Sequence, residues 1–279
     1  MYLRRLALSF FFAVGLVASA AQAKTICTVA ADAASHTILI QQGDCNQRVT
    51  AASTFKIAIS LMGYDSGFLK DAHSPALPFH EGYADWGGEA WRQTTDPSRW
   101  IQYSVVWYSQ QVTRSLGEAR FRKYVDEFQF GNEDVSGDPG KHNGLTHAWI
   151  DSSLKISPLE HVSFLERVVD RQFPVTAQAY DMTSQITQLG QLPNGWDIHG
   201  KTGTGFPRAA DGSDDTAHGY GWFVGWATKG PRTIVFARLV QDEKKEAGAV
   251  GLRTRAKFLR ELPALLDTLI DGPSAHRLQ

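Results

Sequence analysis

The sequence predicts an α/β (α+β) fold, in which an antiparallel sheet built from both ends of the chain packs with helices and carries an inserted all-helical subdomain. Strand-like segments occur early and late in the chain, at residues 25–31, 37–42, 196–203, 220–227 and 233–240. The residues between these groups follow helical periodicity instead. Strands that bracket a helical middle are typical of a sheet domain with a helical insertion.

Length and composition indicate a globular protein with a full core. The chain has 279 residues, enough for one large compact unit. Its hydrophobic content of 43% and charged content of 20% are ordinary for a folded domain. A formal net charge of −1 gives no electrostatic reason to expect nucleic acid or an anionic membrane as a partner.

The N-terminus has the features of a signal peptide. Two arginines precede an apolar run over residues 6–18, and Ala21-Gln22-Ala23 forms a small-x-small cleavage site. We therefore expect a signal peptide over 1–23, export to the periplasm, and a single mature domain over 24–279. The apolar run is short for a transmembrane helix, although an uncleaved anchor is the alternative. No stable membrane association is expected after cleavage.

The only two cysteines are Cys27 and Cys45, both near the start of the mature chain. In an oxidising compartment such a pair favours a disulfide, with two buried free thiols as the alternative. A simple hairpin between them does not by itself bring Cys45 opposite Cys27.

The first half of the chain is expected to begin with a hairpin that turns at 32–34. A helix then starts at Ser53 and ends near Gly63 or Gly67. Prolines and glycines interrupt any periodicity over residues 71–99. Three tryptophans in and after this segment are expected to be packing anchors: Trp86, Trp91 and Trp100.

The helical subdomain is expected to span roughly 65–175. Asp96-Pro97 is a helix start, since aspartate caps well and proline suits the first helical position. Gly117 should separate two amphipathic helices, and residues 133–148 form a polar loop. Further helices are expected at 110–116, 118–128, 158–171, 176–189 and 254–270.

The helix that starts at Ser53 has a chemically unusual composition. From Phe55 to Met62 it is apolar on nearly every face, which predicts burial, yet Lys56 lies in its first turn. Ser53, three residues earlier, lies on the same face of the helix. A buried lysine has a lowered pKa and can act as a base, and the N–H groups of a helix N-terminus can bind an oxyanion. Ser-x-x-Lys alone is a weak pattern.

A second polar motif, Lys201-Thr202-Gly203-Thr204-Gly205, ends the first of the late strands. Its glycines allow the backbone to approach a ligand closely, while the lysine and the threonine offer a cation and a hydroxyl. Its position on a strand far downstream of a Ser-x-x-Lys helix makes the combination specific.

These motifs, in this order, resemble the class D (oxacillinase-type) serine β-lactamases, whose fold is shared with the penicillin-binding transpeptidases. The resemblance covers essentially the whole mature chain. It rests on these segments: Ser53-Thr54-Phe55-Lys56, Ser104-Val105-Val106, Phe130-Gly131-Asn132, Trp149, Lys201-Thr202-Gly203 and the strand from Tyr220 to Trp226.

The sequence departs from the family pattern at one motif. Phe130 replaces the usual tyrosine, so any hydrogen bond of the tyrosine hydroxyl is lost, although the ring can still pack. Val106 stands where class A enzymes have an asparagine, and no glutamate occupies the setting that class A uses for deacylation. Both observations favour class D.

The resemblance implies a covalent mechanism. Ser53 would be the nucleophile, and Lys56, carboxylated on its amine by CO2 (N6-carboxylysine), would be the general base. The Trp149 indole N–H would bind that carbamate. Ser104 would pass a proton to the β-lactam nitrogen, and Lys201 would raise the positive potential there. No other cofactor and no metal is implied.

The resemblance also implies how the substrate is held. Thr202 and Arg253 would bind the substrate carboxylate, with Arg255 a close competitor for that role. The oxyanion hole would be the N–H groups of Ser53 and Thr204, and Gly203 would allow the close approach. Two apolar side chains would wall off the carbamate: Val106 and Ile150.

The sequence gives less support to other functions. The nine histidines form no His-x-His or His-Glu-x-x-His pattern, so a zinc hydrolase is not indicated, and no Gly-x-Ser-x-Gly elbow occurs. Hydrolysis of a small β-lactam of the penicillin type is therefore expected. A penicillin-binding peptidase or a non-hydrolysing β-lactam sensor is the alternative, and the substrate spectrum and oligomeric state stay open.

Overall fold

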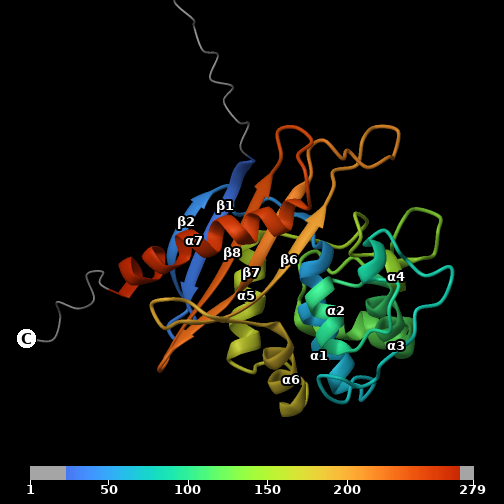
Figure 1. Cartoon of the computed structure of the whole chain (residues 1–279), viewed down its shortest axis with the longest axis horizontal. Coiled ribbons are helices and arrows are strands. Elements are labelled where there is room, and N and C mark those ends of the chain that lie inside the picture. The colour runs from blue at the N-terminus through green and yellow to red at the C-terminus, as the bar shows by residue number, and fades with distance from the viewer. Residues whose placement is uncertain (1–22, 271–279) are drawn as a thin grey trace, which may run out of the picture.

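The computed structural model describes residues 23–270, so nearly all of the predicted signal peptide lies outside the described residues. Its main element is a six-stranded sheet in which every neighbouring pair is antiparallel (Figure 1). The predicted fold class is confirmed. The strands, in spatial order, are β2 Thr37–Gly43, β1 Lys24–Asp32, β8 Arg232–Gln241, β7 Tyr220–Lys229, β6 Asp197–Gly205 and β5 Gln188–Gln191.

Helices cover both faces of this sheet, while others gather beside β6 (Figure 1). The helices are the 3-10 helix η1 Ala52–Phe55, α1 Lys56–Asp65, the 3-10 helix η2 Gly88–Ala90, α2 Pro97–Tyr103, α3 Val106–Phe128, α4 Gly144–His147, α5 Pro158–Val169, α6 Ala177–Thr187 and α7 Val250–Ile270. A two-stranded sheet pairs β3 Val49–Thr50 with β4 Lys155–Ile156, and so joins the chain just before Ser53 to the chain after Trp149.

Side chains alternate between the two faces of the sheet, and the hydrophobic core therefore has two parts. On one face Phe223 and Phe236 pack against Phe258 of α7, with ring centroids 5.3–6.1 Å apart. Trp222, the neighbour of Phe223, points to the other face and joins the larger core with α1, α3 and α5. The sheet is therefore buried on both faces. It meets the remaining helices along β6.

Local signals in the sequence account for most helix ends. The Asp96 side chain caps α2 by accepting from the backbone N–H of Arg99 at 2.8 Å. Ser157 and Glu160 form a capping box at the start of α5. Gly117 has φ 72° and breaks α3 into two helical segments, as predicted.

Several expectations are wrong in detail, and α3, for example, begins at Val106 and not at residue 110. The last helix begins at Val250 and not at Thr254, while α6 ends at Thr187 because the chain then forms the exposed strand β5. Trp91 and Trp100 are buried anchors, but Trp86 is 64% exposed. The division into a catalytic domain over 24–279 with a helical subdomain over roughly 65–175 stays a prediction.

The predicted disulfide between Cys27 and Cys45 is present, and both cysteines are buried. Cys27 pairs with Gly43 across the β1–β2 ladder, and the chain turns back immediately afterwards, with the Asp44 N–H donating to the Ile26 carbonyl. Gly43 permits this turn because its φ is 83° and a Cβ there would lie 2.0 Å from the Ile26 oxygen. The turn after the hairpin is what brings Cys45 to Cys27.

Within the described residues, no helix combines the length and apolar character needed to cross a bilayer.

Candidate active site

Ser53 lies in η1, three residues before α1 begins at Lys56. The preceding residue, Ala52, has φ 47°, a left-handed conformation that costs free energy for a residue other than glycine. Such backbone strain is common where a functional side chain must be presented in one direction. The hydroxyl of Ser53 accepts a hydrogen bond of 3.0 Å from the Lys56 Nζ. The predicted nucleophile and its predicted base are therefore in contact.

Lys56 is fully buried, as the apolar sequence around it predicts. Burial lowers the pKa of its amine well below the ordinary value, and the positive charge of Lys201 lowers it further. The lowered pKa favours the neutral amine, which is the form that can accept a proton or add to CO2.

Trp149 lies in the aromatic cluster beside this helix. Its ring packs 5.6 Å from the ring of Phe55 and 6.2 Å from that of Phe121. The Trp149 Nε1 is buried and has no hydrogen-bond partner. A buried N–H without an acceptor is unfavourable, so an acceptor placed beside it would be bound.

Phe130 is fully buried in the same cluster, 4.8 Å from the ring of Phe55. It also packs edge-on against His161, with ring centroids 5.7 Å apart. The ring thus fills its place in the core without the hydroxyl that the related motif usually supplies.

His161 was not singled out by the sequence analysis. Its Nε2 lies 3.0 Å from the Thr54 hydroxyl, which itself donates to the Ala51 carbonyl. Burial lowers the pKa of His161 to about 3, so the ring is neutral and its Nε2–H donates to Thr54. His161 thereby helps to hold the turn that presents Ser53. A histidine in the middle of a buried helix face gives no sequence signal for this contact.

The second predicted motif lies at an open part of the β6 edge. β5 pairs only with the segment 197–199 of β6, and residues 200–202 and 204 line a cleft beyond it. Gly203 is packed against η1: a Cβ there would lie 3.1 Å from the Thr54 Cγ2 and 3.3 Å from the Ala51 oxygen. The glycine therefore allows the nucleophile turn, rather than a ligand directly, to approach the strand.

Lys201 points back to Ser104, and its Nζ donates to the Ser104 Oγ at 3.0 Å. Lys201 is buried, and burial followed by the charge of Arg255 lowers the pKa of its amine to about 7. Ser104 ends α2 with φ 57°. A lysine that titrates near neutrality next to a hydroxyl can supply a proton to a leaving group through that hydroxyl.

The structure does not place Arg253 where the sequence analysis expected it. Its guanidinium pairs with the buried carboxylate of Asp242 at 2.5 Å and donates to the Ala247 and Gly248 carbonyls. Arg255 lines the cleft instead. At 3.6 residues per turn, two positions two residues apart lie on nearly opposite faces of a helix, so only one of these arginines can face the substrate.

Most of the other predicted side chains line one cleft of about 1460 Å³. Ser53, Ser104, Lys201, Thr202 and Thr204 line it, and so do Trp149 and the two predicted apolar walls, Val106 and Ile150. Lys56 does not line the cleft, because its side chain is fully buried, but it contacts Ser53, which does. Such a wide cleft with a few convergent polar groups is the usual form of a small-molecule site.

Asp151 is a further titratable group of this cleft. Burial raises the pKa of its carboxyl to about 7, although its Oδ1 accepts from the Phe206 N–H at 2.7 Å. Arg208 donates to the Asp151 carbonyl at 2.8 Å. Asp151 therefore ties the segment of Trp149 to the loop that follows β6.

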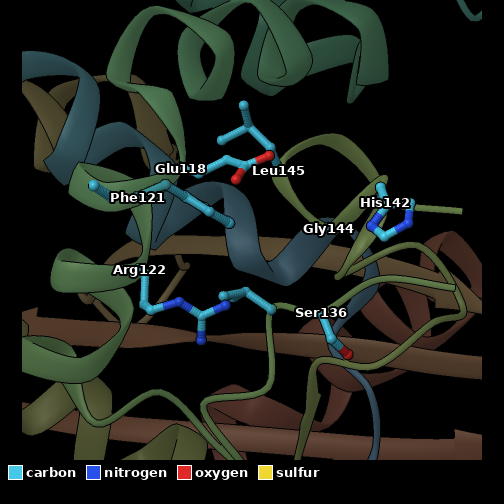
Figure 2. A pocket seen from close by; sticks show the side chains of 9 residues that line it. Glu118, Phe121, Arg122, Ser136, His142, Gly144 and Leu145 are labelled. Atoms are coloured by element: carbon cyan, nitrogen blue, oxygen red, sulfur yellow. The ribbon is translucent and has the colours of Figure 1, made fainter. Parts of the chain in front are cut away.

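A second hollow, of about 530 Å³, lies between α3 and the loop before α4 (Figure 2). It is lined by Glu118, Ala119, Phe121, Arg122, Val135, Ser136, His142, Gly144 and Leu145. These residues include no serine–lysine pair. Within residues 23–270, no group of three His, Cys, Asp or Glu side chains is placed to hold a metal ion.

Comparison with known proteins agrees with this geometry. Residues 26–263 match the family model described as the penicillin binding protein transpeptidase domain. The chain belongs to this family of serine acyl-transfer folds.

The class within the family follows from individual relatives. The chain is 43% identical over 240 residues to β-lactamase OXA-9 of Klebsiella pneumoniae, a match covering 86% of this chain and 88% of the relative. It is 36% identical over 202 residues to β-lactamase OXA-1 of Escherichia coli, covering 72% and 70%. The crystal structure of the class D β-lactamase OXA-427 superposes with a TM-score of 0.82 at 48% identity, covering 87% of this chain and 99% of that one. The chain is a class D β-lactamase.

Proposed function

We propose that this protein hydrolyses penicillin-type β-lactams through an ester on Ser53, with Lys56 as the carboxylated general base. One observation carries the proposal. The Ser53 hydroxyl is held 3.0 Å from a buried lysine amine, in the same cleft as a buried tryptophan N–H that has no partner.

The residues around Lys56 fit a carboxylated amine. Burial favours the neutral amine, which is the form that adds to CO2. A carbamate there would be an anion in a largely dry site and would need donors. The orphaned Trp149 Nε1–H and the Ser53 hydroxyl are such donors. When bound, the carboxyl group would supply a base that accepts the Ser53 proton and later a proton from water.

Acylation would proceed from Ser53. Its Oγ forms a bond with the β-lactam carbonyl carbon while the backbone N–H groups of Ser53 and Thr204 bind the oxygen. The ring C–N bond then breaks, and the nitrogen takes a proton from the Ser104 hydroxyl, which Lys201 replenishes across their 3.0 Å hydrogen bond. Water next attacks the ester carbonyl, Ser53 is released, and the product leaves as the ring-opened acid.

The substrate carboxylate is assigned to Thr202 and Arg255. Both line the cleft, whereas Arg253 is paired with Asp242. Arg255 also contributes positive charge at Lys201, which is where the carboxylate of a bound substrate would be attracted.

Export to the periplasm is part of the proposal. The Cys27–Cys45 disulfide supports it, because structural disulfides persist in oxidising compartments. The substrate is a small β-lactam, and no stable membrane association is proposed for the mature chain.

Fast hydrolysis separates this function from its alternatives. We expect purified protein mixed with excess benzylpenicillin to turn it over many times, with little acyl-enzyme left in intact-mass spectra after the substrate is consumed. A stoichiometric adduct that persists for many minutes would instead identify a penicillin-binding peptidase or a β-lactam sensor.

A further inference from the structure

The hydroxyl of Thr50 lies between the two segments that carry Ser53 and Trp149. Thr50 is the last residue of β3 and is only 5% exposed. It precedes Ser53 by three residues but does not line the cleft, and no step of the proposed mechanism uses it. A buried hydroxyl needs hydrogen-bond partners inside the protein, so its contacts indicate what it does.

The Thr50 hydroxyl uses all of its hydrogen-bonding capacity. Its Oγ1 donates to the Trp149 carbonyl at 3.1 Å. The same oxygen accepts from the Asp151 N–H at 3.1 Å and from the Ala52 N–H at 3.4 Å. A hydroxyl has one proton to donate and two lone pairs to accept with. These three bonds therefore connect the turn before Ser53 directly to the segment of Trp149.

Both residues that donate to this hydroxyl have a left-handed backbone. Ala52 has φ 47° and Asp151 has φ 48°. This conformation is costly for a residue with a Cβ, and it persists only where surrounding contacts impose it. Because the Thr50 hydroxyl binds the N–H of both residues, it stabilises the two strained turns together.

Thr50 is itself held from several sides. Its carbonyl accepts from the Trp222 indole N–H at 2.9 Å, and it lies opposite Lys155 in the β3–β4 ladder. Its methyl group packs against β6 at Gly205, where a Cβ would lie 2.3 Å from the Thr50 Cγ2. Rotation of the side chain is therefore restricted, and the hydroxyl keeps one direction.

The two segments that the hydroxyl joins carry the donors proposed for a carboxylated lysine. Ser53 follows Ala52 in the chain, and its hydroxyl lies 3.0 Å from the Lys56 Nζ. Trp149 carries the buried Nε1, which has no hydrogen-bond partner among the described residues. A carbamate in this dry site would need both donors at once, so its binding depends on how the two segments are placed relative to each other.

We propose that Thr50 is a positioning residue, whose hydroxyl sets the position of Ser53 relative to Trp149 and thereby favours carboxylation of the buried lysine. This inference rests on the proposed function. Thr50 acts through the backbone groups that it bonds and not through the cleft. Loss of the hydroxyl should therefore weaken carboxylation more than it weakens binding of the β-lactam.

The test measures carboxylation directly, by 13C NMR of the protein titrated with 13C-labelled bicarbonate at fixed pH. Thr50→Val keeps the shape of the side chain and removes the hydroxyl, so we expect the bicarbonate concentration for half-maximal carboxylation to rise about tenfold. Thr50→Ser keeps the hydroxyl and should stay within about twofold of the wild type.

Steady-state hydrolysis of benzylpenicillin gives a second measurement. Without added bicarbonate, kcat of Thr50→Val should fall while its KM changes by less than about twofold, and added bicarbonate should restore kcat. A variant that had merely lost stability would not recover in this way.

Thr113→Val is the matched control. Thr113 is also buried, and its hydroxyl donates to a backbone carbonyl, that of Gln110 at 3.3 Å, away from the cleft. Its bicarbonate dependence should equal that of the wild type. Circular dichroism checks that each variant is folded, and Thr50→Ala takes the place of Thr50→Val if the valine is not accommodated.

A Thr50→Val protein that is carboxylated at the wild-type bicarbonate concentration overturns the inference and leaves the proposed function intact. An equal rise in Thr113→Val also overturns it, because the effect would then be general. An equal rise in Thr50→Ser overturns it as well, since the methyl group and not the hydroxyl would be responsible. A wild-type protein that takes up no labelled carbon would instead overturn the carboxylated base of the proposed function, and this inference with it.

Discussion

The Lys201 Nζ donates a 3.0 Å hydrogen bond to the Ser104 Oγ, a residue 97 positions earlier in the chain. Lys201 belongs to the sheet and Ser104 to the end of α2, so the bond joins the two walls of the cleft. A substrate bound between them contacts groups from both parts of the molecule.

Ser53→Ala should abolish hydrolysis. The alanine leaves the cleft and the Lys56 amine in place but removes the atom that forms the ester. Intact-mass spectrometry after incubation with benzylpenicillin should show no covalent adduct. Hydrolysis retained at near the wild-type rate would exclude Ser53 as the nucleophile.

Activity should depend on CO2 through Lys56 and Trp149. Degassing at mildly acid pH should slow turnover, and added bicarbonate should restore it. Trp149→Phe keeps a packed ring and removes the N–H, so we expect about tenfold more bicarbonate for half-maximal activity. The signal of 13C-labelled carbon bound to the protein should weaken in parallel, and Lys56→Ala should lack it.

Trp100→Phe is the control for this comparison. It also removes a buried indole N–H, the one that donates to Ser109 at 2.8 Å, but it lies outside the cleft. Its bicarbonate dependence should match that of the wild type. If removal of bound CO2 leaves turnover unchanged, the carboxylated lysine is excluded and an unmodified lysine must act as the base.

The two arginines of α7 should have separable effects. Arg255→Ala should raise KM for benzylpenicillin about tenfold or more, since a charge-assisted contact with the carboxylate is lost. Arg253→Ala should instead reduce the free energy of unfolding by on the order of 2 kcal/mol, because it leaves the buried Asp242 carboxylate without its partner. Equal KM effects from the two variants would contradict this assignment.

Asp151→Asn should stabilise the fold more at alkaline than at acid pH. The folded-state pKa of Asp151 is raised to about 7 from 3.8, so the folded protein binds more protons than the unfolded chain between these values. Stability is therefore lost as pH rises through this window, and asparagine escapes the loss. In urea unfolding, the advantage of the variant should grow by on the order of 2 kcal/mol between about pH 5 and about pH 8. An advantage independent of pH would show that Asp151 does not titrate in this range.

Removal of the disulfide should lower stability without changing the chemistry. The cysteines are 18 positions apart, and a loop of this size contributes about 3 kcal/mol in the chain-entropy model. The Cys27→Ser/Cys45→Ser protein should unfold at lower urea concentration than the wild type. Unfolding curves that coincide would show that the bond contributes nothing measurable.

Much of the fold could be predicted because its signals are local. Asp96-Pro97, Ser157-Pro158 and Gly117 each mark a helix end by backbone geometry that few residues satisfy. The start of α7 has no such signal, since Ala249 and Val250 favour no particular cap. The error of four residues there obscured the first helical turn, in which Arg253 engages Asp242 and the loop carbonyls.

The site was predictable as a set of motifs but not as a set of contacts. Ser53 and Lys56 are three residues apart, so helix geometry alone brings them together. The contact of His161 and the exposure of Trp86 depend on the tertiary structure. His161 reaches Thr54 across 107 positions, and Trp86 is exposed because the turn that carries it lies at the mouth of a cleft. Tryptophan is buried so often in proteins that its presence at position 86 predicts a buried side chain, and this prediction is wrong here.

The pairing of β1 with β8 has a consequence for how the enzyme becomes active. Lys24 lies beside Gln241 in this ladder, so the central strands of the sheet cannot pair until almost the whole chain has been made. Ser53 emerges early in synthesis, whereas Lys201 and its strand emerge late. Long-range pairing of this kind slows folding. A ribosome-bound or truncated chain that ends before β8 is consequently without a complete sheet, so the cleft that joins Ser53 to Lys201 forms only when synthesis is nearly finished.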